Sequence, residues 1–184
     1  MLIQSPNPKG IDVKLQNFQR DLHTHLITKW GLDANANDYT CYDRCYRNQK
    51  TNGFIPEVYN QNGSYTDVVF NDNIKALSFF GLGNSIEYLM SNHSNVASVH
   101  LIFCVDLKKL KGGVTRPDEE VRQDVQLFAY LKKYSFIPTS IEIGIDNVFT
   151  EYNALQVNYK DLQPFHCFRF NFDVTYPFKD HVCT

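Results

Sequence analysis

Residues 164–176, PFHCFRFNFDVTY, carry the most regular pattern in the chain and decide the fold we expect. From Phe168 every second residue is apolar, while Arg169 and Asp173 belong to the intervening polar set. Successive side chains of a strand point to opposite faces, so this alternation predicts a long strand with one apolar face. The residues expected to face the core are Phe168, Phe170, Phe172, Val174 and Tyr176.

Other segments upstream of this one also predict strands. Residues 96–107, VASVHLIFCVDL, alternate with an apolar side that runs from Ala97 to Leu107, and residues 140–146, SIEIGID, place Ile141, Ile143 and Ile145 inward. Four shorter runs, separated by turns at Asn52-Gly53 and Asn62-Gly63, predict a meander; they are residues 41–47, 55–60, 66–70 and 78–83.

Two segments have helical spacing instead. Apolar residues from Ile11 to Leu26 recur every three or four positions, which predicts a helix that ends near Trp30, with Gly31 as its stop. A second helix is expected from about Pro117 to Tyr134, because acidic residues follow the proline and lysines lie at the other end.

The element order predicts an α+β fold, a mostly antiparallel sheet covered on one face by two main helices. The central strands of a doubly wound sheet would be apolar on both faces, and these strands are not. We expect residues 1–10 to form an N-terminal arm, residues 11–177 a single domain and residues 178–184 a C-terminal tail, with both ends flexible.

Composition excludes several classes of protein. Among 184 residues, 43% are hydrophobic and 14% aromatic, which excludes wholesale disorder. A net charge of -2 argues against a dedicated nucleic-acid binder. No apolar run of membrane-spanning length occurs and the first ten residues do not resemble a secretion signal, so we expect no membrane association. The five scattered cysteines are expected to be reduced thiols.

The search for chemistry yields alternatives rather than a site. His23 and His25 would point away from each other on a helix, and Cys41 and Cys45 would share a face of a strand at a distance of about 13 Å, so no metal site or cofactor is expected. The strand-face carboxylates Glu142, Asp146 and Asp173 leave open a small metal-dependent hydrolase or nuclease. The segment CFRFNFDV leaves open an RNA-binding α+β domain, although it lacks the glycine of the usual RNA-binding motif.

One loop is strongly basic. Around Gly112-Gly113 it carries Lys108, Lys109, Lys111 and Arg116, and it is the best candidate to contact phosphate or the acidic surface of a partner.

The order of these segments resembles that of the tail-terminator and neck-ring proteins of tailed bacteriophages. The resemblance is carried by FQRDLHTHLITKW (18–30), then CYDRCYR (41–47), IPEVYN (55–60) and YTDVVFND (65–72), then VHLIFCVDL (99–107) and DEEVRQDVQLFAYL (118–131). The segment NDNIKALSFFGLGN (71–84) also resembles structural proteins of Bacteroides-infecting phages, including the crAss-like group.

This resemblance implies a structural role without catalysis. The chain would be a subunit of a ring in the neck or tail of the virion, made in the host cytoplasm, that joins the head connector to the tail. Its partners would be copies of itself, adjacent portal, adaptor or tail proteins, and DNA in transit. The loop with Lys108, Lys109, Lys111 and Arg116 would then face either the DNA channel or an adjacent ring.

Overall fold

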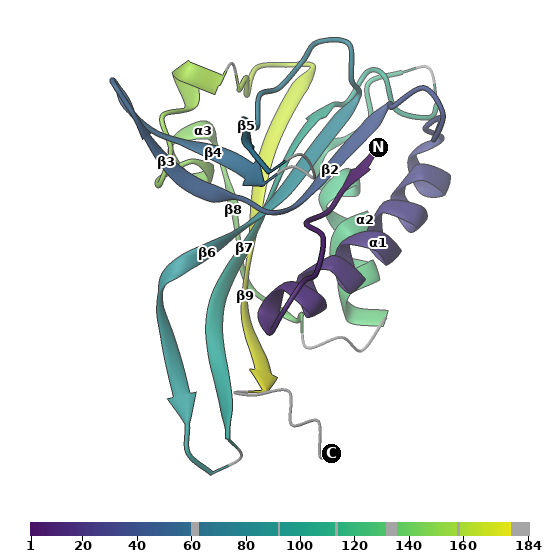
Figure 1. Cartoon of the computed structure of the whole chain (residues 1–184). Coiled ribbons are helices and arrows are strands. Elements are labelled where there is room, and N and C mark those ends of the chain that lie inside the picture. The colour runs from purple at the N-terminus through teal and green to yellow at the C-terminus, as the bar shows by residue number, and fades with distance from the viewer. Residues whose placement is uncertain (60–62, 92, 113, 132–135, 158, 178–184) are drawn as a thin grey trace.

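The computed structural model describes residues 1–59, 63–91, 93–112, 114–131, 136–157 and 159–177. Two long helices pack on one face of a six-stranded sheet, and a smaller sheet lies on the other face (Figure 1). The expected α+β class and the helix layer on one face are confirmed. The second layer was not anticipated.

The large sheet is built around β7 and β9, two long strands that pair along their whole length. Its order is β1-β2-β6-β7-β9-β8, and every pairing is antiparallel except those of β1 with β2 and β2 with β6. The bounds are β1 (Leu2–Ile3), β2 (Tyr39–Arg44), β6 (Ala76–Leu89), β7 (Ser94–Asp106), β8 (Pro138–Ile143) and β9 (Phe165–Pro177).

The register of β9 is the one expected from its sequence. Phe168, Phe170 and Phe172 are fully buried in the core that also contains the apolar stripes of the helices. Arg169, Asn171 and Asp173 lie on the opposite face, where they are partly or largely exposed. The paired strand β7 contributes its odd-numbered residues from Ala97 to Val105 to the same helix-side core, and Leu107 follows directly after the strand.

The helices follow their predicted bounds closely. Helix α1 (Ile11–Trp30) ends at Gly31, whose positive φ of 64° lets the chain turn while the N–H of Leu32 donates to Ile27 O (2.9 Å). Helix α2 (Asp118–Leu131) begins as predicted, and its expected end near Tyr134 lies outside the described residues. Between helices and sheet, Phe18 stacks on Phe136 with ring centroids 4.4 Å apart.

The predicted meander divides between two sheets. Strands β3 (Tyr46–Lys50), β4 (Gly53–Tyr59) and β5 (Tyr65–Asp67) form the small antiparallel sheet, whereas β2 and β6 enter the large one. The small sheet, with α3 (Ile145–Val148) and the 3₁₀ helix η1 (Ala154–Val157), covers a second core that includes Ile102 and Cys104 of β7. The second face of β7 is therefore buried along much of its length rather than polar and open.

The N-terminal residues are not a free arm over their whole length. Leu2 pairs with Cys41, and the N–H of Cys41 donates to Met1 O at 2.8 Å, so β1 extends the large sheet by one short parallel strand. Backbone pairing thus holds the first residues against the domain, which sequence periodicity cannot reveal in so short a strand. The C-terminal tail, residues 178–184, lies outside the described residues.

The expectation that the isoleucines of residues 140–146 point into the core is wrong for two of them. Ile141 and Ile143 share a face with Phe170 and Phe168, but they remain 38% and 49% exposed. Their strand β8 is the last of the sheet, so they lie beyond the part of that face that the helices cover.

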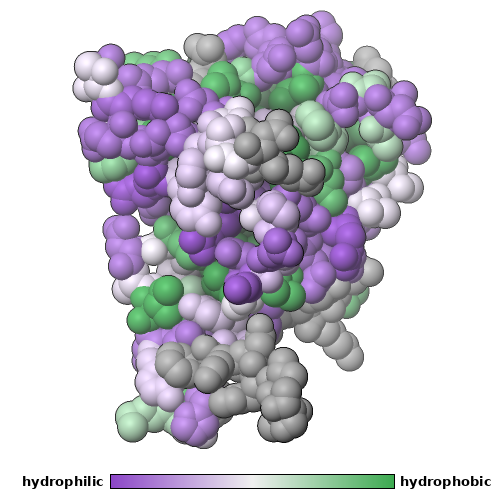
Figure 2. Space-filling model, in the orientation of Figure 1, coloured by the Kyte–Doolittle hydropathy of each residue, from purple (hydrophilic) through white to green (hydrophobic). Residues whose placement is uncertain are grey.

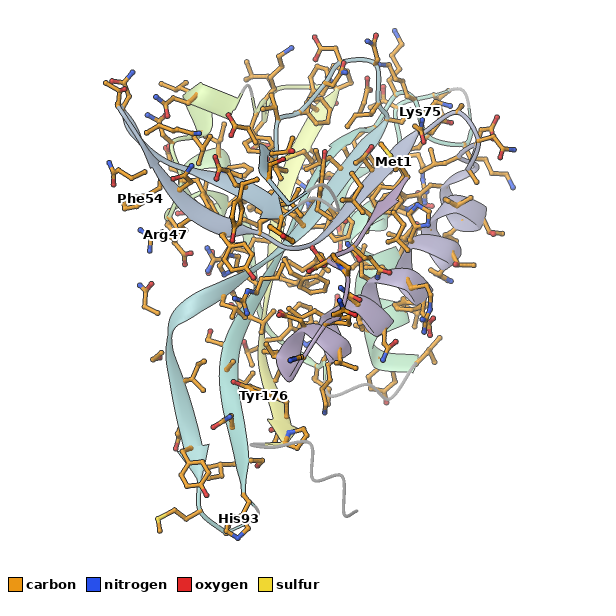
Figure 3. All side chains as sticks on the ribbon, viewed as in Figure 1. Met1, Arg47, Phe54, Lys75, His93 and Tyr176 are labelled. Atoms are coloured by element: carbon orange, nitrogen blue, oxygen red, sulfur yellow. The ribbon has the colours of Figure 1, made fainter. Side chains whose placement is uncertain are left out.

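Strands β6 and β7 form a long hairpin, and β9 accompanies β7 as far as Ser94, close to the tip. Their lower halves project below the helices and the small sheet (Figure 1), and His93 marks the tip while Tyr176 lies near the end of β9 (Figure 3). The pairing of β6 with β7 shifts register between Leu82 and Ile86, which marks a bulge where the hairpin leaves the domain.

Substitution of Phe170 by alanine tests the register of the central strands. Phe170 is fully buried, so its truncation should lower the free energy of unfolding by about 3 to 5 kcal/mol, measured in denaturant melts. Ile143→Ala, at a half-exposed position of the neighbouring strand, is the control and should cost less than about 1 kcal/mol. A similar small loss for both variants would contradict the register.

Candidate functional site

The four basic residues of the loop between β7 and α2 do not form one patch. Lys108, Lys109 and Lys111 are exposed. Lys109 is held against the domain, since its Nζ lies 3.3 Å from Asp106 Oδ2 and donates to Asp72 O at 2.7 Å. Arg116 is buried, with 8% of its surface exposed. The expected basic loop therefore lacks Arg116 as a surface charge, and of its three exposed lysines Lys109 is paired with Asp106.

Arg116 instead belongs to a buried ionic cluster centred on Asp124 of α2. Its guanidinium Nη2 lies 3.1 Å from Asp124 Oδ2 and also contacts the carboxylate of Glu120. Trp30 Nε1 donates to the same Asp124 oxygen at 3.0 Å, and Lys29 Nζ lies 3.5 Å from the other. The cluster joins the end of α1, the loop and α2, so the role of Arg116 is to hold these elements together.

Loss of Arg116 should destabilise the protein rather than change a binding surface. Arg116→Met leaves Asp124 buried without its closest cation, and the expected loss is about 3 kcal/mol in the free energy of unfolding. Lys108→Ala, in the same loop but exposed, should change stability by less than about 0.5 kcal/mol. Equal losses in chemical denaturation would show that Asp124 does not depend on Arg116.

A second polar cluster lies between the large sheet and the small one. His100 of β7 is 1% exposed, and its Nε2 faces Glu151 Oε2 at 3.6 Å. Arg169 Nη2 of β9 lies 3.5 Å from Glu151 Oε1, and Arg47 of β3 carries its guanidinium over the ring of Phe54 (4.4 Å), as Figure 3 shows for the labelled pair. Burial, with the positive charges of Arg169 and Arg47, lowers the pKa of His100 to about 3.

The backbone of β6 makes room for this histidine. A Cβ atom at Gly81 would lie 2.0 Å from His100 Nε2, so only glycine fits beside the ring. The glycines of the Gly81-Leu82-Gly83 segment therefore include one needed for close packing. A neutral histidine enclosed in this way has no open side toward a substrate.

The buried neutral state of His100 predicts a pH dependence of stability. The pKa of His100 in the folded protein is below its value of 6.5 in the unfolded chain, so unfolding takes up a proton between about pH 3 and 6.5. The stabilisation is therefore complete above pH 6.5 and is lost as the pH falls through this range. We expect the stability of the wild type, relative to His100→Gln, to fall by about 1 kcal/mol per pH unit between pH 6 and 4. A difference that stays constant in melts across this range would show that His100 protonates in the folded protein.

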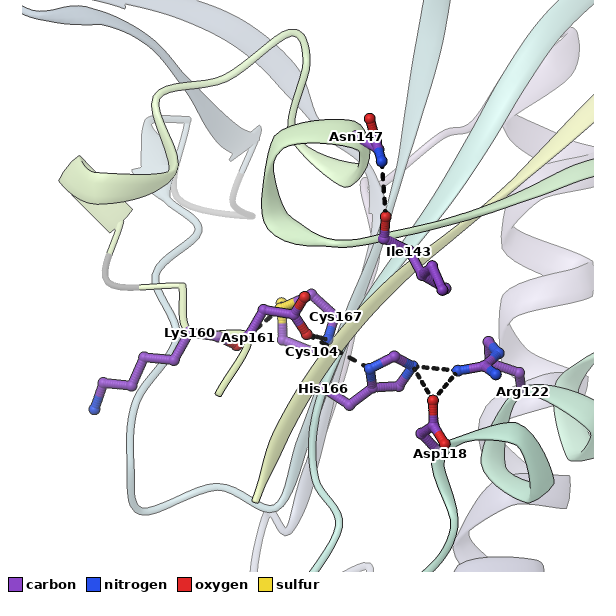
Figure 4. Close-up of polar contacts among 9 residues, drawn as sticks. All are labelled: Cys104, Asp118, Arg122, Ile143, Asn147, Lys160, Asp161, His166 and Cys167. Atoms are coloured by element: carbon purple, nitrogen blue, oxygen red, sulfur yellow. Dashed lines mark hydrogen bonds and ion pairs between the residues drawn. The ribbon is translucent and has the colours of Figure 1, made fainter. Parts of the chain in front are cut away.

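The third cluster surrounds His166 at the start of β9 (Figure 4). His166 Nε2 lies 2.7 Å from Arg122 Nη1, and its Nδ1 lies 3.5 Å from Asp161 Oδ1. Asp118 accepts from Arg122 at 2.6 Å. Burial and the Arg122 guanidinium lower the pKa of His166, which fits a neutral ring whose Nε2 accepts from Arg122. That nitrogen is then not available to take a proton from a substrate.

Two thiols adjoin this cluster. Cys104 and Cys167 are register partners on β7 and β9, with their sulfur atoms 3.3 Å apart, and both are free and buried. Burial raises the pKa of Cys104, so its thiol is protonated and unreactive at neutral pH. The pair fills space in the second core.

The residues considered for metal or acid–base chemistry are dispersed. Glu142 accepts from Asn171 Nδ2 at 2.7 Å and lies 3.7 Å from Arg169 Nε, while Asp146 lies in α3 and Asp173 lies farther along β9. Within the described ranges no three His, Cys, Asp or Glu side chains gather in a way that could hold a metal ion.

The histidine and cysteine pairs have separate environments. His23 stacks on Tyr39 with ring centroids 5.1 Å apart, and His25 lies over Phe128 at 5.0 Å. Cys41 lies in the helix-side core and Cys45 in the other, which corrects the expectation of a shared face. The register shift between Tyr42 and Arg44 reverses the side to which the following residues point.

Two groups of exposed apolar side chains lie at edges of the large sheet, while others, such as Leu155 and Leu162, are exposed elsewhere. One group lies where α2 meets β8: a groove of about 540 Å³ lined by Lys29, Gln123, Leu127, Tyr130, Ile137 and Pro138. A second groove of about 280 Å³ continues along β8 and includes Ile141 and Ile143. We call the two grooves together the β8 groove.

The second group lies on the projecting hairpin. Ile86, Tyr88 and Met90 are 54%, 45% and 79% exposed. In Figure 2 the hairpin, at the lower left, bears hydrophobic and hydrophilic side chains side by side. Neither group could be predicted from the sequence, because apolar residues at alternating positions form the same pattern whether or not another element covers them.

Comparisons with known proteins add no relative: no family model matches the sequence, and no curated protein or solved structure is significantly similar to it. No helix in the described part of the chain is long and apolar enough to cross a bilayer.

Proposed function

We propose that this chain is a structural subunit of a ring in the neck or tail of a tailed-phage virion, where the ring joins the head connector to the tail. The observation that carries the proposal is the pair of different apolar surfaces on one sheet, the hairpin at one edge and the β8 groove at the other. A cyclic ring requires two different surfaces that meet between successive copies.

The polar clusters support a structural role. His100, His166 and Arg116 each contact other side chains of the domain, and the three clusters connect separate elements. The hydrogen-bonded networks around Arg116 and His166 stabilise a rigid subunit, and rigidity suits a ring that must keep its shape. Adjacent portal, adaptor or tail proteins would contact the faces of the ring.

DNA in transit is a further proposed contact. Lys108 and Lys111 are outward charges of the loop, and several copies in a ring would sum them into a band of positive charge. Such contact would be weak and independent of sequence, as is expected when lysines meet only phosphates.

The test of this function is a cryo-electron microscopy reconstruction of the particle. We expect several copies of the chain, related by rotation, between the head and the tail. Absence of the chain from the particle, or its presence only as scattered monomers inside the capsid, would overturn the proposal.

A further inference from the structure

We propose that successive copies join through their sheets, with the lower half of β6 in one copy paired antiparallel with β8 of the next. The partner is a second copy of this chain, and the inference rests on the proposed ring function. It specifies which backbone edges meet and which side chains lie between them.

The first edge is the outer side of β6. Strand β2 pairs with β6 from Ala76 to Phe80, and beyond that point β6 pairs only with β7 through the described residues down to Leu89. The stretch from Asn84 to Tyr88 is exposed. Unpaired backbone groups on an exposed edge are a ready template for another strand.

The second edge is β8, the last strand of the sheet. It pairs with β9 on one side, and no strand of the described chain pairs with it on the other. Thr139, Ser140 and Ile141 are exposed. The chain thus offers two open edges on opposite sides of one sheet, which is the arrangement that head-to-tail extension needs.

The apolar side chains of the two edges lie on the same face. Ile86 is the register partner of Ala97, which belongs to the helix-side core, and Tyr88 lies two residues farther on the same side. Ile141 is the partner of Phe170, in the same core. If the sheet continues from copy to copy, Ile86 and Tyr88 enter the β8 groove beside Ile141 and are removed from water.

Strand direction also agrees. Strand β7 is antiparallel to β6, β9 to β7, and β8 to β9, so β8 runs opposite to β6. A sheet that continues with the same orientation therefore joins β6 to the next β8 in an antiparallel pair, the slightly more stable pairing.

The position of β2 sets the offset between copies. The register of β8 with β9, of β9 with β7 and of β7 with β6 places β8 at the height of residues 78–82 of β6. Strand β2 already pairs with the free edge of β6 up to Phe80 at this height. The next copy must shift along the strand to reach residues 84–88. Across the bulge between Leu82 and Ile86, this shift corresponds to about four residues of β7, or about 13 Å. Four strand spacings of about 4.8 Å per copy then give a strand tilt of about 35°, which is within the range of closed sheets.

Disulfide trapping tests the pairing. Ile86→Cys and Ile141→Cys are made in separate chains that both carry Cys183→Ser, since the other four cysteines are buried. The two chains are mixed and oxidised with copper phenanthroline. We expect at least tenfold more of the mixed dimer than in a control mixture of Leu155→Cys with Ile141→Cys, because Leu155 is 86% exposed but belongs to η1 on the other face.

The outcomes separate this inference from the proposed function. No excess of the mixed dimer over the control, or dominant Ile86→Cys homodimers, would overturn edge pairing, even for a chain found in the neck ring. A strong mixed crosslink in a chain that is absent from the virion would support edge pairing and overturn the virion role. Unchanged melting temperatures of the variants establish that each is folded.

Discussion

The register between β7 and β9 is the constraint on which the rest of the structure depends. All thirteen residues of β7 have partners on β9, so this pair assigns each side chain to one of the two faces of the sheet. Phe168, Phe170 and Phe172 meet the helices, while Cys167 meets Cys104 in the core under the small sheet. A slip by one residue would move every one of these side chains to the wrong face, placing Arg169 against the apolar stripes of the helices.

The buried charges act within this frame as connections between elements. Asp124 receives Arg116 from the loop and Trp30 from the end of α1, and His166 lies between Arg122 of α2 and Asp161. The contacts of Trp30 with Asp124 and of Arg122 with His166 join segments that are distant in sequence. Removal of one partner would leave a buried polar group unsatisfied. The groups most able to perform chemistry are therefore used to hold the helix layer and the loops against the sheet.

Apolar side chains remain exposed at both open edges of the sheet, although others, such as Leu155, are exposed elsewhere. Exposed edges flanked by apolar side chains favour aggregation unless a partner covers them. Here the hairpin with Ile86 and Tyr88 lies at one edge of the sheet and the β8 groove with Ile141 at the opposite edge. The apolar side chains of both edges lie on the same face. This asymmetry is consistent with repeated head-to-tail assembly, and it links the fold to the proposed ring without requiring any reactive group.

Both long helices, the alternation of β9 and the α+β class could be predicted from the sequence, because helical and strand periodicities are local properties of consecutive residues. The sequence also indicated Gly31 as a helix stop. It could not determine that Arg116 is buried or that Cys41 and Cys45 separate, since these depend on an ionic partner eight residues away and on a bulge. Nor could it distinguish buried Phe170 from exposed Ile141, although both alternate equally well. Burial is decided by which element lies above a strand, and only the tertiary structure leaves β8 at the open edge while β9 lies beneath the helices.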